Sequence, residues 1–119
     1  MSEIVVLIVD DDAAALRALV RALKLEADFT ILTAGSREEA EEVVAVNRVD
    51  VTVIDGLYGD GAKLVEQLVA TGLGGKLVAY SSNDEDQGAM IGAGCAVGLK
   101  KPFRLDDMMT LIRRLAASP

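Results

Sequence analysis

Short apolar segments rich in β-branched residues alternate along this chain with segments of helical periodicity. The clearest is residues 4–9, with the sequence IVVLIV, which is apolar throughout rather than at every second position. Such a run is typical of a strand buried on both faces, as in a parallel sheet covered by helices. Comparable segments occupy residues 29–33, 51–54, 76–80 and 95–99. The alternation predicts an α/β fold: a doubly wound, five-stranded parallel sheet with helices on both faces, in a single domain over residues 1–119.

Periodicity and capping signals locate the helices between these strands. In residues 16–23 apolar side chains recur at the spacing of one helix face. Ser36 with Glu39 three residues later forms a capping box, which predicts a helix start. Residues 84–91 are predicted to form a short helix of low stability, because an interior glycine costs about 1 kcal/mol relative to alanine. Two of the helices have a clear face that is predicted to pack against the sheet. Its residues are Ala40, Val43, Val44 and Asn47 in the second helix, and Leu105, Met108, Met109, Ile112, Leu115 and Ala116 in the last.

Composition excludes several kinds of function. The chain has no His and one Cys, which excludes Ser-His-Asp triads, imidazole metal sites and an internal disulfide. Its net charge of −7 argues against nucleic acid as a partner, because phosphate backbones attract basic surfaces. No apolar run approaches the roughly 18 residues of a membrane span, and no basic leader precedes the first strand. We therefore expect a cytoplasmic protein without membrane contact.

Polar and charged residues follow four of the five predicted strands where each strand ends. They are Asp10, Asp11 and Asp12 after the first strand, Asp55 after the third, Ser81, Ser82 and Asn83 after the fourth, and Lys100 and Lys101 after the fifth. Open α/β sheets bind ligands outside the carboxyl ends of their strands. We therefore expect carboxylates, a hydroxyl and an ammonium group to meet at one edge of the sheet.

This combination of groups favours one kind of chemistry. Clustered carboxylates repel one another unless a cation joins them, and Mg²⁺ binds carboxylate, water and phosphate oxygens. A lysine and a serine hydroxyl nearby suit a phosphoryl group, as a positive charge and a hydrogen-bond donor. Since no His or suitably placed Cys is available, an aspartate is the expected nucleophile, and carboxylates do form acyl phosphates. The residues thus predict Mg²⁺-dependent phosphorylation of an aspartate.

Taken singly, these residues also have plainer interpretations. The acidic run could cap the first helix, and the others could be ordinary turn or surface residues, so that only the set favours a phosphoryl site. Asp12 is assigned to the helix cap, and Ser82 competes with Ser81 for the hydroxyl role. Lys100 is expected to face solvent, and Cys95 to be a small buried apolar residue.

The ordered set of motifs resembles the response-regulator receiver domain of two-component signalling, and is similar to the single-domain chemotaxis regulators. The matching motifs are VDDD at residues 9–12, Asp55 after VTVI, Ser81 after LVAY, and KPF at residues 101–103. Together they cover essentially the whole chain in order and spacing. The resemblance implies a flavodoxin-like (βα)5 fold with strand order 2-1-3-4-5.

The resemblance also implies how a phosphoryl group arrives. A sensor histidine kinase or phosphotransfer protein would donate it to Asp55. Mg²⁺ would be bound by Asp10, Asp11, Asp55 and the backbone carbonyl of Leu57. The result would be a changed surface for a downstream protein target of unknown identity.

Two further roles follow from the resemblance. Ser81 would contact a phosphoryl oxygen, and Lys101 would pair with Asp55 or its phosphate. The Lys101–Pro102 peptide bond is expected to be cis, which only X-Pro bonds allow at low cost. On this interpretation the chain is a signalling domain and not an enzyme, apart from its own phosphorylation and dephosphorylation.

Two features depart from the family pattern and keep other hypotheses open. Gly98 stands where the family usually has an aromatic residue that moves with the hydroxyl, and the loop over residues 56–61 is shortened. These departures favour a second hypothesis, a receiver-like protein-binding module with atypical or lost phosphorylation switching. A third, a small Mg²⁺-dependent phosphohydrolase, is disfavoured because Leu57 stands where such enzymes usually have a second acid.

Overall fold

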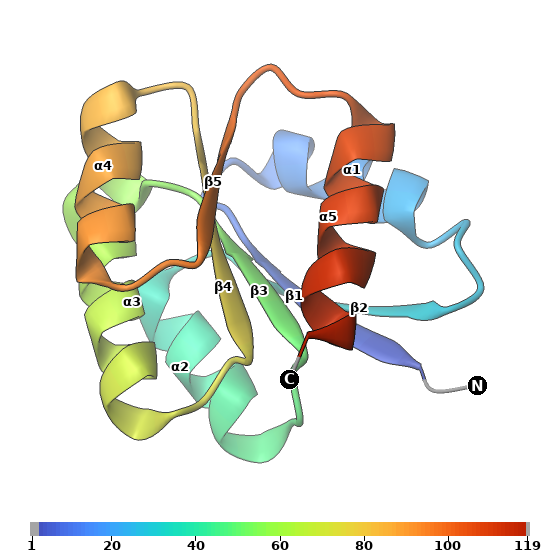
Figure 1. The fold of residues 1–119 in the computed structure, drawn as a ribbon, viewed down its shortest axis with the longest axis horizontal. Coiled ribbons are helices and arrows are strands. Elements are labelled where there is room, and N and C mark those ends of the chain that lie inside the picture. Colours follow the sequence, from blue (N-terminus) through green and yellow to red (C-terminus); the bar gives the residue numbers. More distant parts are fainter. Residues whose placement is uncertain (1–2, 119) are drawn as a thin grey trace.

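The computed structural model describes residues 3–118, whose strands form one parallel sheet flanked by helices (Figure 1). The strands are β1 (Ile4–Val9), β2 (Phe29–Ala34), β3 (Val51–Ile54), β4 (Lys76–Ser81) and β5 (Val97–Lys100). The helices are α1 (Ala13–Leu23), α2 (Arg37–Val46), α3 (Asp60–Thr71), α4 (Asp84–Ala93) and α5 (Leu105–Ala117), with a 3₁₀ turn, η1, at Leu57–Gly59. The order across the sheet is β2-β1-β3-β4-β5, which confirms the predicted topology.

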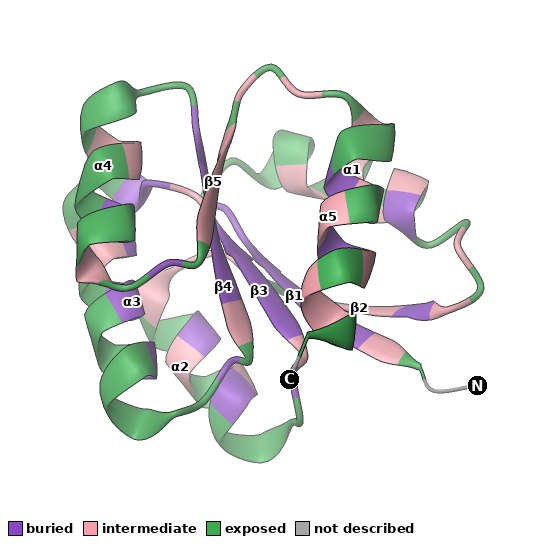
Figure 2. Ribbon diagram, viewed as in Figure 1, coloured by how far each residue is buried: buried purple, intermediate pink, exposed green. Residues whose placement is uncertain are grey.

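Helices cover both faces of the sheet and divide the core into two apolar clusters. In Figure 1, α1 and α5 lie on one face, and α2, α3 and α4 lie on the other. Along β1, Val5, Leu7 and Val9 point toward α2, α3 and α4, whereas Val6 and Ile8 point toward α1 and α5. Burial is concentrated in the central strands (Figure 2). Because successive strand residues point to opposite faces, β1 must be apolar at every position.

The fifth strand begins two residues later than the predicted range of 95–99. Cys95 is buried, as predicted, but its N–H donates to the carbonyl of Met90 at 3.1 Å and so completes the end of α4. The N–H of Ala96 then donates to the carbonyl of Leu77, and pairing with β4 begins at Val97. The apolar character of Cys95 therefore reflects burial under a helix end rather than strand structure.

The capping box at α2 is confirmed in part, and one predicted inner residue is wrong. Ser36 Oγ accepts the N–H of Glu39 at 3.1 Å, whereas the Glu39 carboxylate accepts the N–H of Gly35 at 3.2 Å. Asn47 is exposed and follows the last helical residue, and its amide donates to the carbonyl of Val43. A polar side chain at this position closes the helix end instead of entering the core.

The last two helices differ in how much they bury. The predicted apolar face of α5 is confirmed, since Met108 and Ile112 are fully buried and the other members pack against them. The fourth helix is longer than predicted and has only one buried residue, Met90. The α5 helix therefore packs on the sheet through a large apolar face, whereas α4 buries little apolar surface.

The loop after β3 forms a tight turn. Leu57, Tyr58 and Gly59 all have positive φ, at 50°, 52° and 96°. Two residues later, a Cβ on Gly61 would lie 2.5 Å from the carbonyl oxygen of Asp55. Only glycine permits this approach, and it allows α3 to begin directly beside the end of β3.

Candidate functional site

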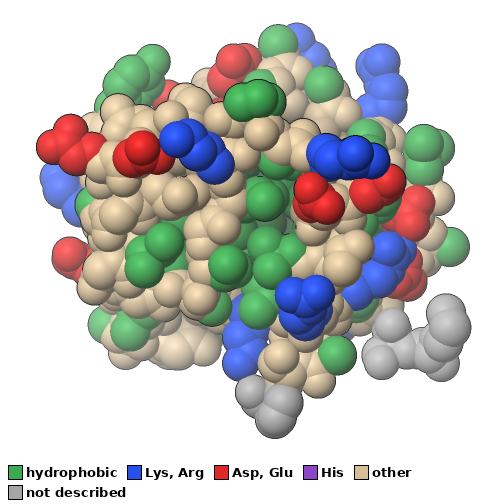
Figure 3. All heavy atoms as spheres, turned by 45° about the horizontal axis from the view of Figure 1, so that its top comes forward, with side chains coloured by type: hydrophobic (Ala, Val, Ile, Leu, Met, Phe, Trp, Pro, Cys, Tyr) green, Lys and Arg blue, Asp and Glu red, His purple; other side chains and the backbone are tan. Residues whose placement is uncertain are grey.

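The carboxyl ends of the strands bring the predicted site residues together. Asp10 follows β1, Asp55 follows β3, Ser81 ends β4 and Lys101 follows β5. These four residues, with Asp11, line one open cavity of about 300 Å³ at this edge of the sheet. Figure 3 brings this edge forward and shows acidic and basic side chains interspersed, with hydrophobic side chains between them.

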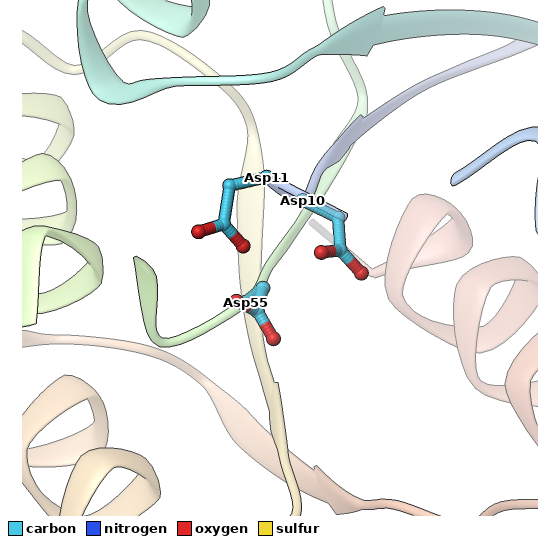
Figure 4. Close-up of side chains that lie close together, drawn as sticks. All are labelled: Asp10, Asp11 and Asp55. Atoms are coloured by element: carbon cyan, nitrogen blue, oxygen red, sulfur yellow. The ribbon is translucent and has the colours of Figure 1, made fainter. Parts of the chain in front are cut away.

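Three carboxylates point toward a common centre. Figure 4 shows the side chains of Asp10, Asp11 and Asp55 close together. One oxygen from each carboxylate lies within 4.8 Å of the other two. Asp10 is 3% exposed, Asp55 is partly buried and Asp11 is exposed, so the group opens from the core toward solvent. Asp12 also lines the cavity but is not part of this group, and its carboxylate accepts the N–H groups of Ala14 and Ala15, which confirms its assignment as the α1 cap.

Lys101 supplies the positive charge of the cluster. Its Nζ lies 2.8 Å from Asp55 Oδ1 and 3.4 Å from Asp10 Oδ2. Burial alone would lower the pKa of Lys101, but the hydrogen bond that it donates to Asp55 and the charges of Asp55 and Asp10 raise it above its usual value. The Lys101–Pro102 peptide bond is cis, as predicted. Lys100 is exposed, as predicted, and forms an ion pair with Asp84 at 2.9 Å.

The turn after β3 fixes the orientation of Asp55. Its second carboxylate oxygen, Oδ2, accepts the N–H of Leu57 at 3.0 Å, while Oδ1 faces Lys101. The Leu57 carbonyl accepts the N–H of Asp60 within the same turn. A cation at this site would therefore share the Leu57 oxygen with a backbone hydrogen bond.

Ser81 lies buried at the end of β4, and its Oγ accepts the N–H of Asn83 at 3.0 Å. Asn83 in turn caps α4, with its side chain accepting the N–H groups of Glu85 and Asp86. The competitor Ser82 is exposed. The hydroxyl side of the cavity is thus connected by one short turn to the start of α4.

Two residues beside the site were missed by sequence reasoning. The hydroxyl of Tyr80 donates to Asp10 Oδ2 at 2.6 Å. Gln87 of α4 lies over Gly98, where a Cβ would come within 2.7 Å of Gln87 Cδ. Both contacts join segments that are apart in the sequence. For Tyr80, the one signal in the sequence was its place directly before Ser81 at the end of a predicted strand.

Comparison with known proteins identifies the family to which the chain belongs. The family model of the response regulator receiver domain matches residues 6–113. The chain belongs to this family. Receiver domains are the signalling domains of two-component response regulators, and residues 6–113 include every side chain of the cavity.

Individual relatives agree with this assignment. Response regulator MprA of Mycobacterium ulcerans is 32% identical over an alignment of 114 residues, which covers 92% of this chain and 49% of the relative. The chain thus spans about half the length of the curated relatives it matches. Among solved structures, the Francisella response regulator 1452 receiver domain has the same fold, with a TM-score of 0.84 at 24% identity, covering 96% of this chain and 97% of that one.

A second solved structure agrees with the same fold. A response regulator from Thermotoga maritima has a TM-score of 0.84 at 23% identity, covering 98% of this chain and 99% of that one. Among the helices in residues 3–118, none combines the length and the apolar character that a membrane crossing requires.

Proposed function

We propose that this receiver domain accepts a phosphoryl group on Asp55 in a Mg²⁺-dependent reaction. The observation that carries the proposal is the position of Asp55, whose carboxylate lies 2.8 Å from Lys101 Nζ and within 4.8 Å of the carboxylate oxygens of Asp10 and Asp11. A nucleophilic carboxylate between an ammonium group and two other acids suits the transfer of a highly charged group.

The donor set fits a hard divalent cation. Three carboxylates supply oxygen ligands, and the fourth proposed ligand, the Leu57 carbonyl, lies on the turn that also orients Asp55. When bound, Mg²⁺ would neutralise negative charge on the transferring phosphoryl group. Asp10, Asp11, Asp55 and Leu57 are the residues that would hold it.

The remaining residues act on the phosphoryl group itself. An Asp55 oxygen forms a bond to phosphorus while the bond from phosphorus to the donor's imidazole nitrogen breaks, and the nitrogen leaves with the electron pair. Lys101 then pairs with a phosphoryl oxygen, and Ser81 donates its hydroxyl to another. Because the Ser81 hydroxyl contacts the turn into α4, its movement would be passed to that helix.

The proposal extends to partners and location. The donor is a sensor histidine kinase or a phosphotransfer protein, and the phosphorylated surface binds a downstream protein target. We propose that residues 1–119 form one receiver domain that acts in the cytoplasm without membrane or nucleic-acid contact of its own. Its only reactions are its own phosphorylation and dephosphorylation.

Treatment with acetyl phosphate and Mg²⁺ tests the proposal. We expect a hydroxylamine-sensitive adduct on Asp55, detected by mass spectrometry, which is absent in Asp55→Asn. Asp11→Asn should need much more Mg²⁺ for the same adduct. Asp12→Asn is the matched control, because asparagine caps α1 equally well and Asp12 lies outside the carboxylate group. Absence of any adduct in the unmodified chain would refute the proposal.

One observation favours a second function, protein binding without phosphorylation switching. Gln87 occupies the space over Gly98 in which the family's switch aromatic would lie. If the domain acts by protein contacts alone, Asp55→Asn should leave its activity in cells intact. Loss of that activity in Asp55→Asn would exclude this alternative.

A further inference from the structure

Tyr80 connects the core of the domain to the proposed metal site. It is the second-last residue of β4 and is 2% exposed, with its ring in the cluster beneath α5. Its hydroxyl leaves this cluster at the carboxyl edge of the sheet and donates to Asp10 Oδ2 at 2.6 Å. Since β3 lies between β1 and β4 in the sheet, the tyrosine reaches across a strand to make this bond.

Both oxygens of the Asp10 carboxylate are engaged by donors. Oδ1 accepts the N–H of Asp12 at 2.9 Å, and Oδ2 accepts from Tyr80 and, at 3.4 Å, from Lys101. Asp10 is 3% exposed, so these donors satisfy most of the hydrogen bonding that a buried carboxylate requires. The rotation of the Asp10 side chain is therefore fixed by hydrogen bonds on both sides, and Tyr80 provides the shorter of the two bonds to Oδ2.

The ring of Tyr80 also contacts the lysine of the site. Lys101 Nζ lies 4.2 Å from the ring centroid, a cation–π distance. The same ring also meets Phe103 edge to face, with centroids 6.2 Å apart and planes at 74°. One buried side chain thus holds two groups that flank Asp55, the ammonium group by its ring and the carboxylate by its hydroxyl.

We propose that Tyr80 is a positioning residue of the metal site, whose hydroxyl holds the Asp10 carboxylate in the orientation that a divalent cation requires. This inference rests on the proposed function of the same site. Groups that hydrogen-bond to ligating side chains fix their direction, and their loss typically weakens metal binding by about 10–100-fold. The competing interpretation is structural, with Tyr80 merely satisfying a buried carboxylate.

The test compares the unmodified chain with Tyr80→Phe, which removes only the hydroxyl and keeps the ring beside Lys101 and Phe103. Mg²⁺ affinity is measured by calorimetry, and phosphorylation by acetyl phosphate is measured over a range of Mg²⁺ concentrations. We expect Tyr80→Phe to raise the Mg²⁺ dissociation constant about tenfold. The phosphorylation rate should recover to the unmodified level when Mg²⁺ is saturating, because the hydroxyl acts through the ligand and not on the phosphoryl group.

A matched control and a double variant separate the possible outcomes. Tyr58→Phe removes the hydroxyl of a tyrosine that is 97% exposed and should change neither measurement. In an Asp10→Asn background, Tyr80→Phe should produce little further loss of Mg²⁺ affinity, since its effect passes through Asp10.

Unchanged or tighter Mg²⁺ binding in Tyr80→Phe would overturn the inference. So would a rate that stays low at saturating Mg²⁺ together with a lower melting temperature, which would assign Tyr80 a structural role. If the unmodified chain itself binds no Mg²⁺ and forms no adduct, the proposed function fails first, and the two failures are thereby distinguished.

Discussion

The two sides of the cavity are held in different ways. On one side, which we call the anchored half, Asp10, Tyr80 and Lys101 are joined by hydrogen bonds and a ring contact. On the other, the α4 half, Ser81 Oγ accepts a hydrogen bond from the turn into α4, and the Gln87 side chain donates a long hydrogen bond of 3.4 Å to the carbonyl of Ala79 in β4. The proposed metal side is thus preorganised by hydrogen bonds among its charged groups, whereas the hydrogen bonds on the side facing α4 run to a turn and to one glutamine side chain.

Burial beneath the two halves follows the same division. The α5 helix beside the anchored half contributes Met108 and Ile112, both with 0% exposure, to one apolar cluster. The α4 helix contributes a single buried side chain, Met90, and has Gly88 and Gly92 in its interior. Segments with little apolar burial open at lower free energy than the rest of a domain. A switch built on this fold is therefore best placed at α4.

Truncation of one isoleucine in each helix should show the largest difference in the free energy of unfolding between the two halves. Ile112→Ala in α5 should lower the free energy of unfolding by about 2–5 kcal/mol, because it leaves a cavity in the core. Ile91→Ala in α4 should lower it by less than about 1 kcal/mol, because that side chain is 45% exposed. Urea unfolding measures both. Equal losses would mean that α4 is packed as firmly as α5.

Alanine in place of the α4 glycines should stabilise α4 and so reduce the difference in stability between the two halves. A Cβ on Gly88 or Gly92 would meet nothing within 4 Å, and neither residue has a positive φ. Each substitution should raise the free energy of unfolding by up to about 1 kcal/mol, because alanine is the better helix former. Gly72→Ala is the control: it also has open space, but its φ of +71° should make the substitution destabilising. Destabilisation by the α4 substitutions would contradict this account.

Much of the site was predictable, because it depends on where strands end. Asp10, Asp55 and Lys101 each follow an apolar strand, and a parallel sheet brings such positions to one edge whatever their distance in sequence. Tyr80 was not predicted, since its partner Asp10 lies beyond an intervening strand, and nothing local indicates which neighbour a buried hydroxyl will reach. Gln87 was missed because helix-to-strand packing depends on side-chain volume at Gly98, which strand and helix patterns do not encode.

Labelling of Cys95 should report opening of the α4 half. This thiol lies buried just after α4, and burial raises its pKa to about 12, so the folded protein presents little thiolate at neutral pH. Alkylation should proceed through an open state, and the double substitution Gly88→Ala with Gly92→Ala should slow it up to about tenfold for each 1.4 kcal/mol of added stability.

The pH dependence identifies the reacting state in that experiment. Reaction through an open state should rise with pH only until roughly 8.5, the ordinary thiol pKa, and then level off. Reaction in the folded state would continue to rise toward the raised pKa of about 12. A rate that is unaffected by the glycine substitutions would show that Cys95 is exposed by some movement other than opening of α4.

The smallest effect on stability is expected at the contact between Gly98 of β5 and Gln87 of α4. Gly98→Ala places a Cβ 2.7 Å from Gln87 Cδ, but a glutamine side chain can move, so the loss should be below about 1 kcal/mol. Gln87→Ala should remove that conflict, and the double variant should lose less stability than the sum of the single variants. A double-mutant cycle by urea unfolding should give a coupling of about 0.5 kcal/mol or more. Additive losses would mean that Gln87 does not fill the space over Gly98, and the packing of α4 against β5 would then not depend on this side chain.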